Sequence, residues 1–333
     1  MPDIPKNIQY QIYGFKNYMG SLVFGTTPKK WLVSVWVPLK TFRVYADGSR
    51  KGDRNAPVVL DFRSNVIKLR QVCKNEPGYS IEVPMLKWVV ERVKEGGDVR
   101  FAMIGLKDDE PYLALTAERE VELYQPSNYM LVIDVNAWNN GIAWGLIKNG
   151  NIIKWKPETP NLREIDTLYN LSVRLSREYG KLKRLGLDKT VEGKRLWWKI
   201  KRLRRKLYAK LRDYVQKLTH RLVKKALRHK ALVIIDDMIE ESRRELLEEK
   251  ISSGLKKLYL MYAKRFVKLL VTQLQWYGVP YEFKRLPSTV CPICGHKLIQ
   301  ERDRVMACEN CGFKAPRDKV PMLWITIKNQ QVL

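Results

Sequence analysis

Residues 129–136, YMLVIDVN, and residues 231–238, ALVIIDDM, are two apolar runs that each reach acidic side chains near their end. A continuous apolar run of this length is typical of a strand that is buried on both faces of a sheet. The first run is followed by GIAWGLI and NIIKWK, which flank an Asn-Gly pair, a strong hairpin signal. We therefore expect three consecutive strands with Asp134 on the first, and a later strand that ends at Asp236.

Long helical segments separate and follow these strands. Within residues 162–230, apolar side chains recur every three or four positions, at Leu196, Ile200, Leu203, Leu207, Leu211, Tyr214, Leu218 and Leu222. Residues 255–278 predict another helix that stops at Gly278, and residues 279–286 predict one more strand. This order of three strands, long helices, a strand, a helix and a strand indicates an RNase H-like α/β core rather than a doubly wound sheet.

The first third of the chain has a different pattern. Residues 30–65 and 99–123 read as short strands separated by turns, which suggests a small antiparallel barrel or sandwich. Residues 66–97 lie between them and predict one helix at most, around MLKWVVERVKEG. We therefore expect a β-rich domain over residues 1–125 with a short helical insertion at about 66–97, and a second domain over residues 126–333.

The charge balance points to a polyanionic partner. Lys and Arg number 62 against 35 Asp and Glu, a formal net charge of +27. Such an excess neutralises phosphates, releases counterions and gives strong, salt-dependent binding. No run of about 18 uncharged apolar residues is present, and the opening MPDIPKNIQY lacks the order of a signal peptide. We expect a cytoplasmic protein that binds nucleic acid and no membrane.

The excess is concentrated in the basic helices of residues 162–230. Residues 171–230 hold 22 Lys and Arg against 4 Asp and Glu, and an inert surface mixes charges because neighbouring cations repel. Trp197, Trp198 and Tyr208 are interleaved there, and either base stacking or core packing accounts for them. The candidates for nucleic-acid contacts are Lys199, Arg202, Arg205 and Lys206, together with Arg317 near the C-terminus.

The cysteines indicate a metal site. Four of the five form two CxxC pairs separated by 13 residues, Cys291 and Cys294, then Cys308 and Cys311. Each pair offers two thiolates on a tight turn, and four thiolates complete the tetrahedral shell of a structural Zn2+. We expect a zinc finger over residues 288–315, with two disulfides as the alternative. Cys73 stands alone and is read as a small buried hydrophobe.

Three aspartates stand where the acids of a metal-dependent nuclease are needed. Asp134 and Asp236 end strands, and Asp318 lies seven residues after Cys311. Pro321 is tolerated only in a first helical turn, so a helix should begin close to Asp318. Two Mg2+ or Mn2+ ions prefer such oxygen ligands, and together they activate water and stabilise the leaving oxygen of a phosphodiester. One strand-terminal aspartate alone is weak evidence, whereas all three at matching positions are specific.

In these motifs the chain resembles the TnpB family of transposon-associated RNA-guided nucleases, relatives of compact type V CRISPR effectors. The resemblance covers about residues 100–330 and is carried by LVIDVNAWNNGIA, DYVQKLTHRLV leading into ALVIIDDM, YEFKRLPSTVCPICG and RVMACENCGFKAPRD. It implies a RuvC core with Asp134, Asp236 and Asp318 as catalytic magnesium ligands, a zinc ribbon inserted in it, and a wedge-like N-terminal barrel. It also implies a guide RNA and target double-stranded DNA as partners, in a prokaryotic cytoplasm and at the nucleoid when bound to DNA.

The sequence departs from the family pattern at three places. Asp236 stands where the family has Glu, and its carboxylate reaches one methylene less far. Pro316 stands where the family often has an acid before Arg-Asp. Asp134 comes early in the chain, which leaves little room for the helical insertion that normally grips the guide–target duplex.

The resemblance makes an RNA-guided DNA endonuclease the leading hypothesis, in which the guide pairs with the target strand and the protein reads a short adjacent motif. One alternative is a weakly active or inactive TnpB-like protein that occupies DNA as a repressor, which Asp236 and the short recognition region favour. Another is a guide-free, structure-selective RuvC nuclease. The zinc finger and the basic helices speak against it, because such a nuclease needs neither. The sequence leaves the guide, the adjacent motif and the oligomeric state open.

Overall fold

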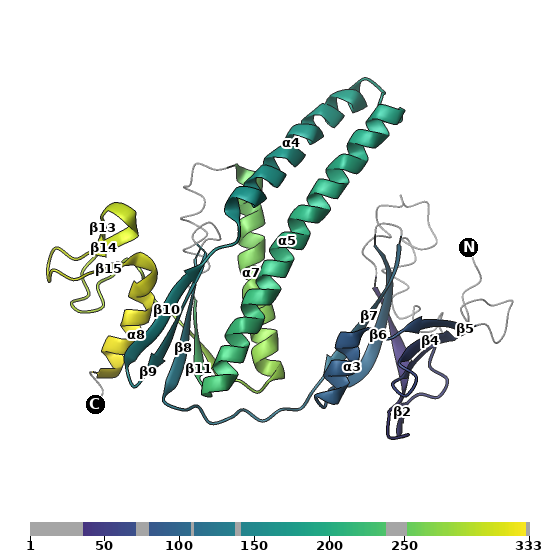
Figure 1. Ribbon diagram of the computed structural model, residues 1–333, viewed down its shortest axis with the longest axis horizontal. Helices are drawn as coiled ribbons and strands as arrows, with labels where there is room; N and C mark the ends of the chain where they lie inside the picture. Colours follow the sequence, from purple (N-terminus) through teal and green to yellow (C-terminus); the bar gives the residue numbers. More distant parts are fainter. Residues whose placement is uncertain (1–35, 71–79, 108–109, 137–140, 238–251, 331–333) are drawn as a thin grey trace, which may run out of the picture. The chain divides into compact units, whose positions relative to one another are not determined.

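The computed structural model describes residues 36–70, 80–107, 110–136, 141–237 and 252–330 of the chain (Figure 1). The chain divides into two compact units, with the boundary between Glu120 and Val121. Cys73 lies outside the described residues, as does most of the acidic stretch EESRRELLEEKISSG (residues 240–254), which we expected to be a loop or exposed helix.

Unit 1 is built on a seven-stranded sheet and one short helix. Its elements are β1 (Trp36–Val44), β2 (Arg50–Gly52), β3 (Val58–Asp61), β4 (Val66–Arg70), β5 (Ser80–Pro84), α3 (Lys87–Lys94), β6 (Asp98–Lys107) and β7 (Glu110–Glu118). The strand order is β5-β4-β3-β1-β6-β7, with β2 paired to β1. Val89 of α3 is fully buried in an apolar cluster with side chains of the sheet, such as Leu60 and Ile67. The β-rich character of this region is as expected, and the closed barrel remains a prediction.

The helix expected around MLKWVVERVKEG is present as α3, Lys87–Lys94. The same residues 66–97 also hold strands β4 and β5, which we did not expect, and these pair with each other from Val66↔Pro84 to Arg70↔Ser80. The β-branched residues of these strands favour a pleated conformation, and their pairing extends the sheet beyond β3. One expectation is wrong: REVELY (residues 119–124), the last strand expected in this part of the chain, pairs with no other strand and connects unit 1 to unit 2.

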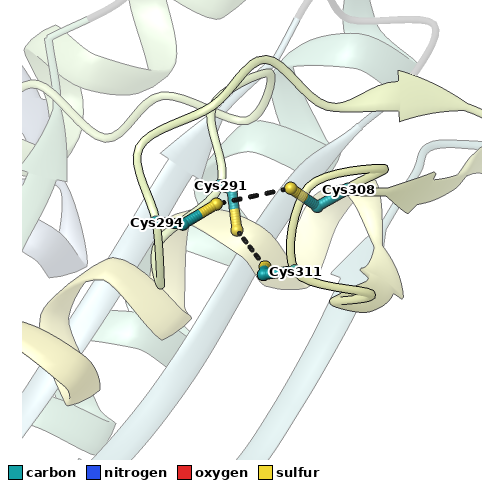
Figure 2. Close-up of side chains that lie close together, drawn as sticks. All are labelled: Cys291, Cys294, Cys308 and Cys311. Atoms are coloured by element: carbon teal, nitrogen blue, oxygen red, sulfur yellow. Dashed lines mark hydrogen bonds between the residues drawn. The ribbon is translucent and has the colours of Figure 1, made fainter.

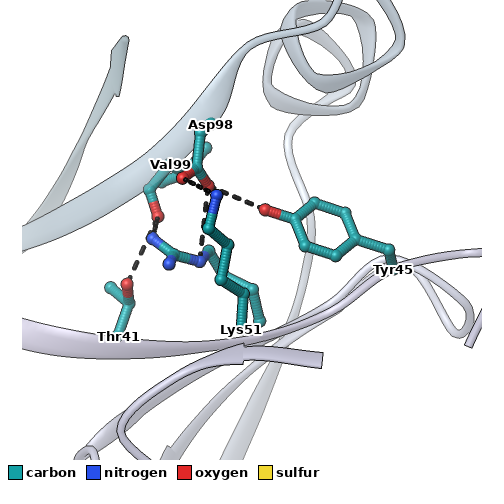
Figure 3. Close-up of polar contacts among 6 residues, drawn as sticks. Thr41, Tyr45, Lys51, Asp98 and Val99 are labelled. Atoms are coloured by element: carbon teal, nitrogen blue, oxygen red, sulfur yellow. Dashed lines mark hydrogen bonds and ion pairs between the residues drawn. The ribbon is translucent and has the colours of Figure 1, made fainter. Parts of the chain in front are cut away.

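A buried ion pair joins β1 and β6 in unit 1 (Figure 3). The Arg43 guanidinium donates to the Val99 carbonyl at 2.8 Å and lies 3.4 Å from the Asp98 carboxylate. The Tyr45 hydroxyl donates to the same carboxylate at 2.7 Å, and Lys51 lies 3.2 Å from it. Burial and the hydrogen bond to Asp98 raise the pKa of Tyr45 to about 12. These partners offset the cost of burying the Arg43 guanidinium, which would be large for an unpaired charge.

Unit 2 is a three-layer α/β structure. Its main elements are β8 (Tyr129–Val135), β9 (Ile142–Lys148), β10 (Asn151–Glu158), α4 (Leu162–Arg184), α5 (Val191–His229), β11 (Leu232–Asp236), α7 (Ser253–Trp276), β12 (Tyr281–Lys284) and α8 (Val320–Gln330). The sheet order is β10-β9-β8-β11-β12, in which β8, β9 and β10 are antiparallel and β11 is parallel to both neighbours. This succession of elements is the one that the sequence predicted.

The two faces of this sheet carry different partners. Leu131 and Ile133 of β8 pack in the larger apolar cluster with α5 and α7, whereas Val132 packs with Met322 of α8. Figure 1 shows α8 on one side of the sheet and the long helices on the other. Because side chains alternate along a strand, Asp134 shares the α8 face with Val132.

The long helix α5 buries one stripe, as its periodicity predicted. Ile200, Leu207, Leu211, Leu218 and Leu222 are each at most 3 % exposed, in contact with the sheet, α4 or α7. Within the described part of the chain, no helix has the length and hydropathy needed to cross a bilayer.

Replacement of Leu211 tests this packing, because its side chain is 0 % exposed whereas that of Leu185, just after α4, is 71 % exposed. We expect Leu211→Ala to lower the free energy of unfolding by about 2–5 kcal/mol, through lost burial and a residual cavity. Leu185→Ala is the matched control and should change it by no more than about 0.5 kcal/mol. Urea unfolding followed by far-UV circular dichroism checks both, and equal effects would contradict the assigned core.

Candidate metal and acid sites

The four cysteines come together on two turns of equivalent geometry (Figure 2). In the first turn, the Cys291 amide donates to the His296 carbonyl at 2.7 Å and the Gly295 amide donates to the Cys291 carbonyl at 3.0 Å. The second turn repeats both bonds, from Cys308 to Phe313 at 2.8 Å and from Gly312 to Cys308 at 2.9 Å. Gly295 and Gly312 have φ values of 76° and 71°, the left-handed region that glycine adopts without strain.

The donor set fits a zinc ion. The four Sγ atoms lie within 4.8 Å of one another, with Cys291–Cys311 at 3.5 Å and Cys294–Cys308 at 3.4 Å. Tetrahedral coordination with Zn–S bonds of about 2.3 Å places sulfurs about 3.8 Å apart. All four thiols are free, so the disulfide alternative is not what the structure contains. Hydrogen bonds from the His296 amide and from Asn310 lower the pKa of Cys294 to about 5, whereas burial and the neighbouring thiols raise the pKa of Cys311 to about 12.

A small antiparallel sheet links this cluster to the third aspartate. The strands β13 (Ile299–Gln300), β14 (Val305–Ala307) and β15 (Lys314–Pro316) pair in order. The 3-10 turn Arg317–Lys319 follows β15 directly, and α8 begins at Val320, so Asp318 precedes the helix by two residues as predicted. Buried Cys291, Cys308 and Val320 belong to one apolar cluster, which packs the zinc module against the start of α8.

Two of the three aspartates end neighbouring parallel strands. Asp134 of β8 and Asp236 of β11 are each 3 % exposed. Asp134 accepts a hydrogen bond from the Asn136 amide group at 2.7 Å, and Asp236 accepts one from the backbone N–H of Leu286 at 2.9 Å. Asp237 is exposed, as expected for the residue after Asp236 on a strand.

The third aspartate, Asp318, forms an ion pair with an arginine. Arg304 donates to a carboxylate oxygen of Asp318 at 2.7 Å, and the Asp318 side chain is 15 % exposed. Arg304 and Asp303 have φ values of 59° and 56°, an unusual pair of left-handed residues in the turn between β13 and β14. This turn of the four-cysteine module thus places the Arg304 guanidinium against the Asp318 carboxylate.

The three carboxylates influence one another electrostatically. Burial raises the pKa of Asp134 well above its usual value, and the charges of Asp236 and Asp318 raise it further. The hydrogen bond from Asn136 and the charge of Arg317 act in the opposite direction. Among the described residues, the cysteines form a group compact enough to hold a metal ion, and the three aspartates are not part of such a group. Asp236 and Asp318 are nevertheless near enough to Asp134 to raise its pKa, and a hard divalent cation would relieve this repulsion.

The basic candidates fall into two groups. Lys199, Arg202, Arg205 and Lys206 are exposed on α5, and Arg317 lies beside the acids with contacts to Ser288 at 3.4 Å and Gln300 at 3.5 Å. Trp197, Trp198 and Tyr208 are 43–60 % exposed, which excludes the core-packing alternative for them.

Sequence reasoning missed three contacts of the acids. Asn136 had a local signal, because it lies two residues after Asp134 on the same face of an extended segment. The Leu286 amide lies 50 residues from Asp236, and the Arg304 guanidinium reaches Asp318 through an unusual turn. Neither contact had a signal in the sequence.

Comparisons with known proteins agree with the motifs. Residues 264–321, which include the four cysteines and Asp318, match the family model described as Cas12f1-like, TNB domain. A TnpB-like protein of Methanocaldococcus jannaschii is 25 % identical over 216 residues, which are 63 % of this chain and 73 % of that protein. The similarity of this chain to the TnpB family is thus confirmed by the family model and the curated relative.

A solved structure also matches. The cryo-EM structure of the Cas12f1–sgRNA–target DNA complex has a TM-score of 0.45 and 12 % sequence identity over 87 % of this chain. The match covers 59 % of the Cas12f1 chain, so this chain spans less than two thirds of that protein's length.

Cys308→Ser tests the metal site. We expect the parent protein to contain one equivalent of zinc by mass spectrometry and the variant to lose most of it, because a hydroxyl is a poor zinc ligand beside three thiolates. His296→Ala is the control, since His296 is exposed and outside the cluster. Zinc loss in His296→Ala with retention in Cys308→Ser would contradict the four-thiolate site.

Asp134→Asn tests the buried carboxyl. The raised pKa means that native Asp134 holds its proton at pH values where the unfolded chain has released it, so this group makes the parent less stable as the pH rises. Without added Mg2+, we therefore expect the free energy of unfolding of Asp134→Asn to rise relative to that of the parent as the pH increases above about 4, where the unfolded carboxyl loses its proton. Asp237→Asn, at the exposed neighbouring carboxylate, is the control. If the free energies of unfolding of Asp134→Asn and the parent differ by the same amount at every pH, the raised pKa of Asp134 is contradicted.

Proposed function

We propose that this chain is an RNA-guided DNA endonuclease of TnpB type, with a RuvC site that hydrolyses phosphodiesters in the presence of Mg2+ or Mn2+. The observation that carries the proposal is the meeting of three aspartates, from the ends of β8 and β11 and from the turn before α8, on one face of the sheet. The similarity to TnpB and to the Cas12f1-like TNB domain supports the RNA-guided class.

The sheet supports an RNase H-like core. Its central strand β8 has an antiparallel neighbour in β9 and a parallel neighbour in β11, and the order β10-β9-β8-β11-β12 is that expected for such a core. In the proposed wedge-like role, unit 1 binds nucleic acid. The setting is the prokaryotic cytoplasm, with association to the nucleoid on DNA binding.

The residues have distinct tasks in this proposal. Asp134, Asp236 and Asp318 would hold divalent ions, which when bound would activate a water molecule and stabilise the leaving oxygen. Asn136 orients Asp134, and the Leu286 amide orients Asp236 through hydrogen bonds to their carboxylates. Arg304 holds Asp318 in place, and the zinc ribbon holds Arg304. The basic surface of α5, with Lys199, Arg202, Arg205 and Lys206, binds phosphates.

A second candidate is a TnpB-like protein that binds DNA under RNA guidance and cleaves weakly or not at all. Two observations favour it. Asp236 is one methylene shorter than the family's Glu and already accepts from Leu286, and one Asp318 oxygen accepts from Arg304.

The central experiment starts from the protein expressed with its flanking DNA. We expect RNA of defined length to copurify, and a duplex that matches this RNA to be cut with Mg2+ or Mn2+. Bound RNA with guided binding and no cleavage supports the second candidate. Cleavage without RNA points to a guide-free nuclease and overturns both.

Asp236→Asn tests the second acid. We expect cleavage to fall more than about 100-fold, because even the outer partners of metal ligands contribute 10- to 100-fold. The adjacent exposed carboxylate offers a matched control, and Asp237→Asn should retain cleavage within a few-fold. Equal rates for the two variants in the same assay would remove Asp236 from the site.

A further inference from the structure

A basic pocket lies where the edge strand β10 meets the last third of α5. It has a volume of about 350 Å3. Its lining includes six cations and one carboxylate: Lys154, Lys156, Arg221, Lys224, Lys225, Arg228 and Glu158. The indole of Trp144, only 4 % exposed, forms part of its wall.

Two periodicities build this pocket. Lys154, Lys156 and Glu158 alternate along β10, and they pair opposite Leu146, Trp144 and Ile142 of β9, which pack toward α5. On α5, the cations at positions 221, 224, 225 and 228 follow the helical repeat, so they lie on one stripe. The strand and the helix therefore direct cations into the same space.

The one carboxylate of the pocket, Glu158, is paired with groups of the protein. Glu158 forms an ion pair with Arg221 and accepts a hydrogen bond from the Trp144 indole N–H at 3.0 Å. The described residues provide no salt bridge for Lys154, Lys156, Lys224, Lys225 or Arg228. The Lys225 ammonium lies 4.6 Å from the centre of the Trp144 ring. Burial, and then the charges of Lys154 and Arg228, lower the pKa of Lys225, and the charge of Glu158 offsets these effects only in part.

The pocket is separate from the acid site. Trp144 and Ile133 pair on the α5 face of the sheet, whereas Asp134 lies on the α8 face. A ligand in the pocket therefore does not contact the three aspartates. From Arg221 to Arg228 the cations extend over seven residue steps of α5, about 10 Å at 1.5 Å per step, which is longer than a single phosphate.

We propose that this pocket binds consecutive phosphates of a nucleic-acid backbone. This inference shares with the proposed function only the assumption that the ligand is a nucleic acid. It requires neither a guide RNA nor cleavage of DNA. Lysine and arginine at such a concave, one-sign surface release counterions from a phosphodiester chain, so each phosphate bound steepens the salt dependence of affinity. RNA and DNA share this chemistry, and separate binding measurements distinguish them.

The test compares two triple variants of the full chain that lose the same charge. The pocket variant is Lys154→Gln, Lys156→Gln, Lys225→Gln. The control variant removes three exposed cations of α7, Lys264→Gln, Arg265→Gln, Lys268→Gln. Dissociation constants are measured for arbitrary single-stranded RNA and for arbitrary duplex DNA of about 20 nucleotides per strand, over a range of salt.

We expect the pocket variant to bind at least one of the two probes about ten-fold more weakly than the control variant. Its slope of log affinity against log salt should shrink by about 0.7 per lost phosphate for RNA or about 0.9 for DNA. A loss confined to RNA assigns the pocket to an RNA backbone, and a loss confined to duplex assigns it to DNA. Equal affinities and slopes for both variants on both probes would overturn the proposal.

Two further measurements keep the outcomes distinct. Lys154→Glu, Lys156→Glu changes only exposed side chains of the edge strand, and it should weaken the same probe even if the triple variant is unstable in thermal unfolding. A pocket-dependent loss in a protein that carries no RNA and cuts no matched duplex would leave this proposal standing while the proposed function fails. RNA-guided cleavage together with unchanged nucleic-acid binding in both pocket variants would overturn this proposal and leave the proposed function standing.

Discussion

The parallel pairing of β8 with β11 is the constraint on which the rest of unit 2 depends. It places Ile133 beside Ile235, so the residues that follow them, Asp134 and Asp236, meet although about 100 positions separate them in the chain. Both strands are buried on both faces, and helices must therefore cover each side. One side receives α5 and α7 and the other receives α8, which brings Asp318 to the face that already holds two carboxylates.

The sequence predicted those features that local patterns determine. The two CxxC pairs specify four thiolates on two glycine turns, and the structure brings them together. The buried stripe of α5 follows from its leucine spacing, and the position of Asp318 before α8 follows from Pro321. The catalytic role of the aspartates and of the basic candidates stays a prediction, since placement alone tests no chemistry.

Other features depend on contacts that no local pattern contains. Strands β4 and β5 form by pairing outward from the edge of β3, which the sequence of residues 66–97 does not reveal, whereas the helical pattern in the same range does form α3. The amide of Leu286 reaches Asp236 only after β12 aligns with β11. The pocket between β10 and α5 likewise arises from two charge patterns, each of which alone reads as an ordinary solvated surface.

The short path from the zinc ribbon to α8 limits how this region can vary. Strand β15, the turn at residues 317–319 and α8 follow one another without a connecting loop, so spare chain is lacking between Cys311 and Asp318. Surface loops accept insertions, but one residue added at this helix start would rotate the carboxylate by about 100° around the helix axis. In a lineage of such proteins, the seven-residue step from Cys311 to Asp318 must therefore keep its length, and so must the β13–β14 turn that carries Arg304.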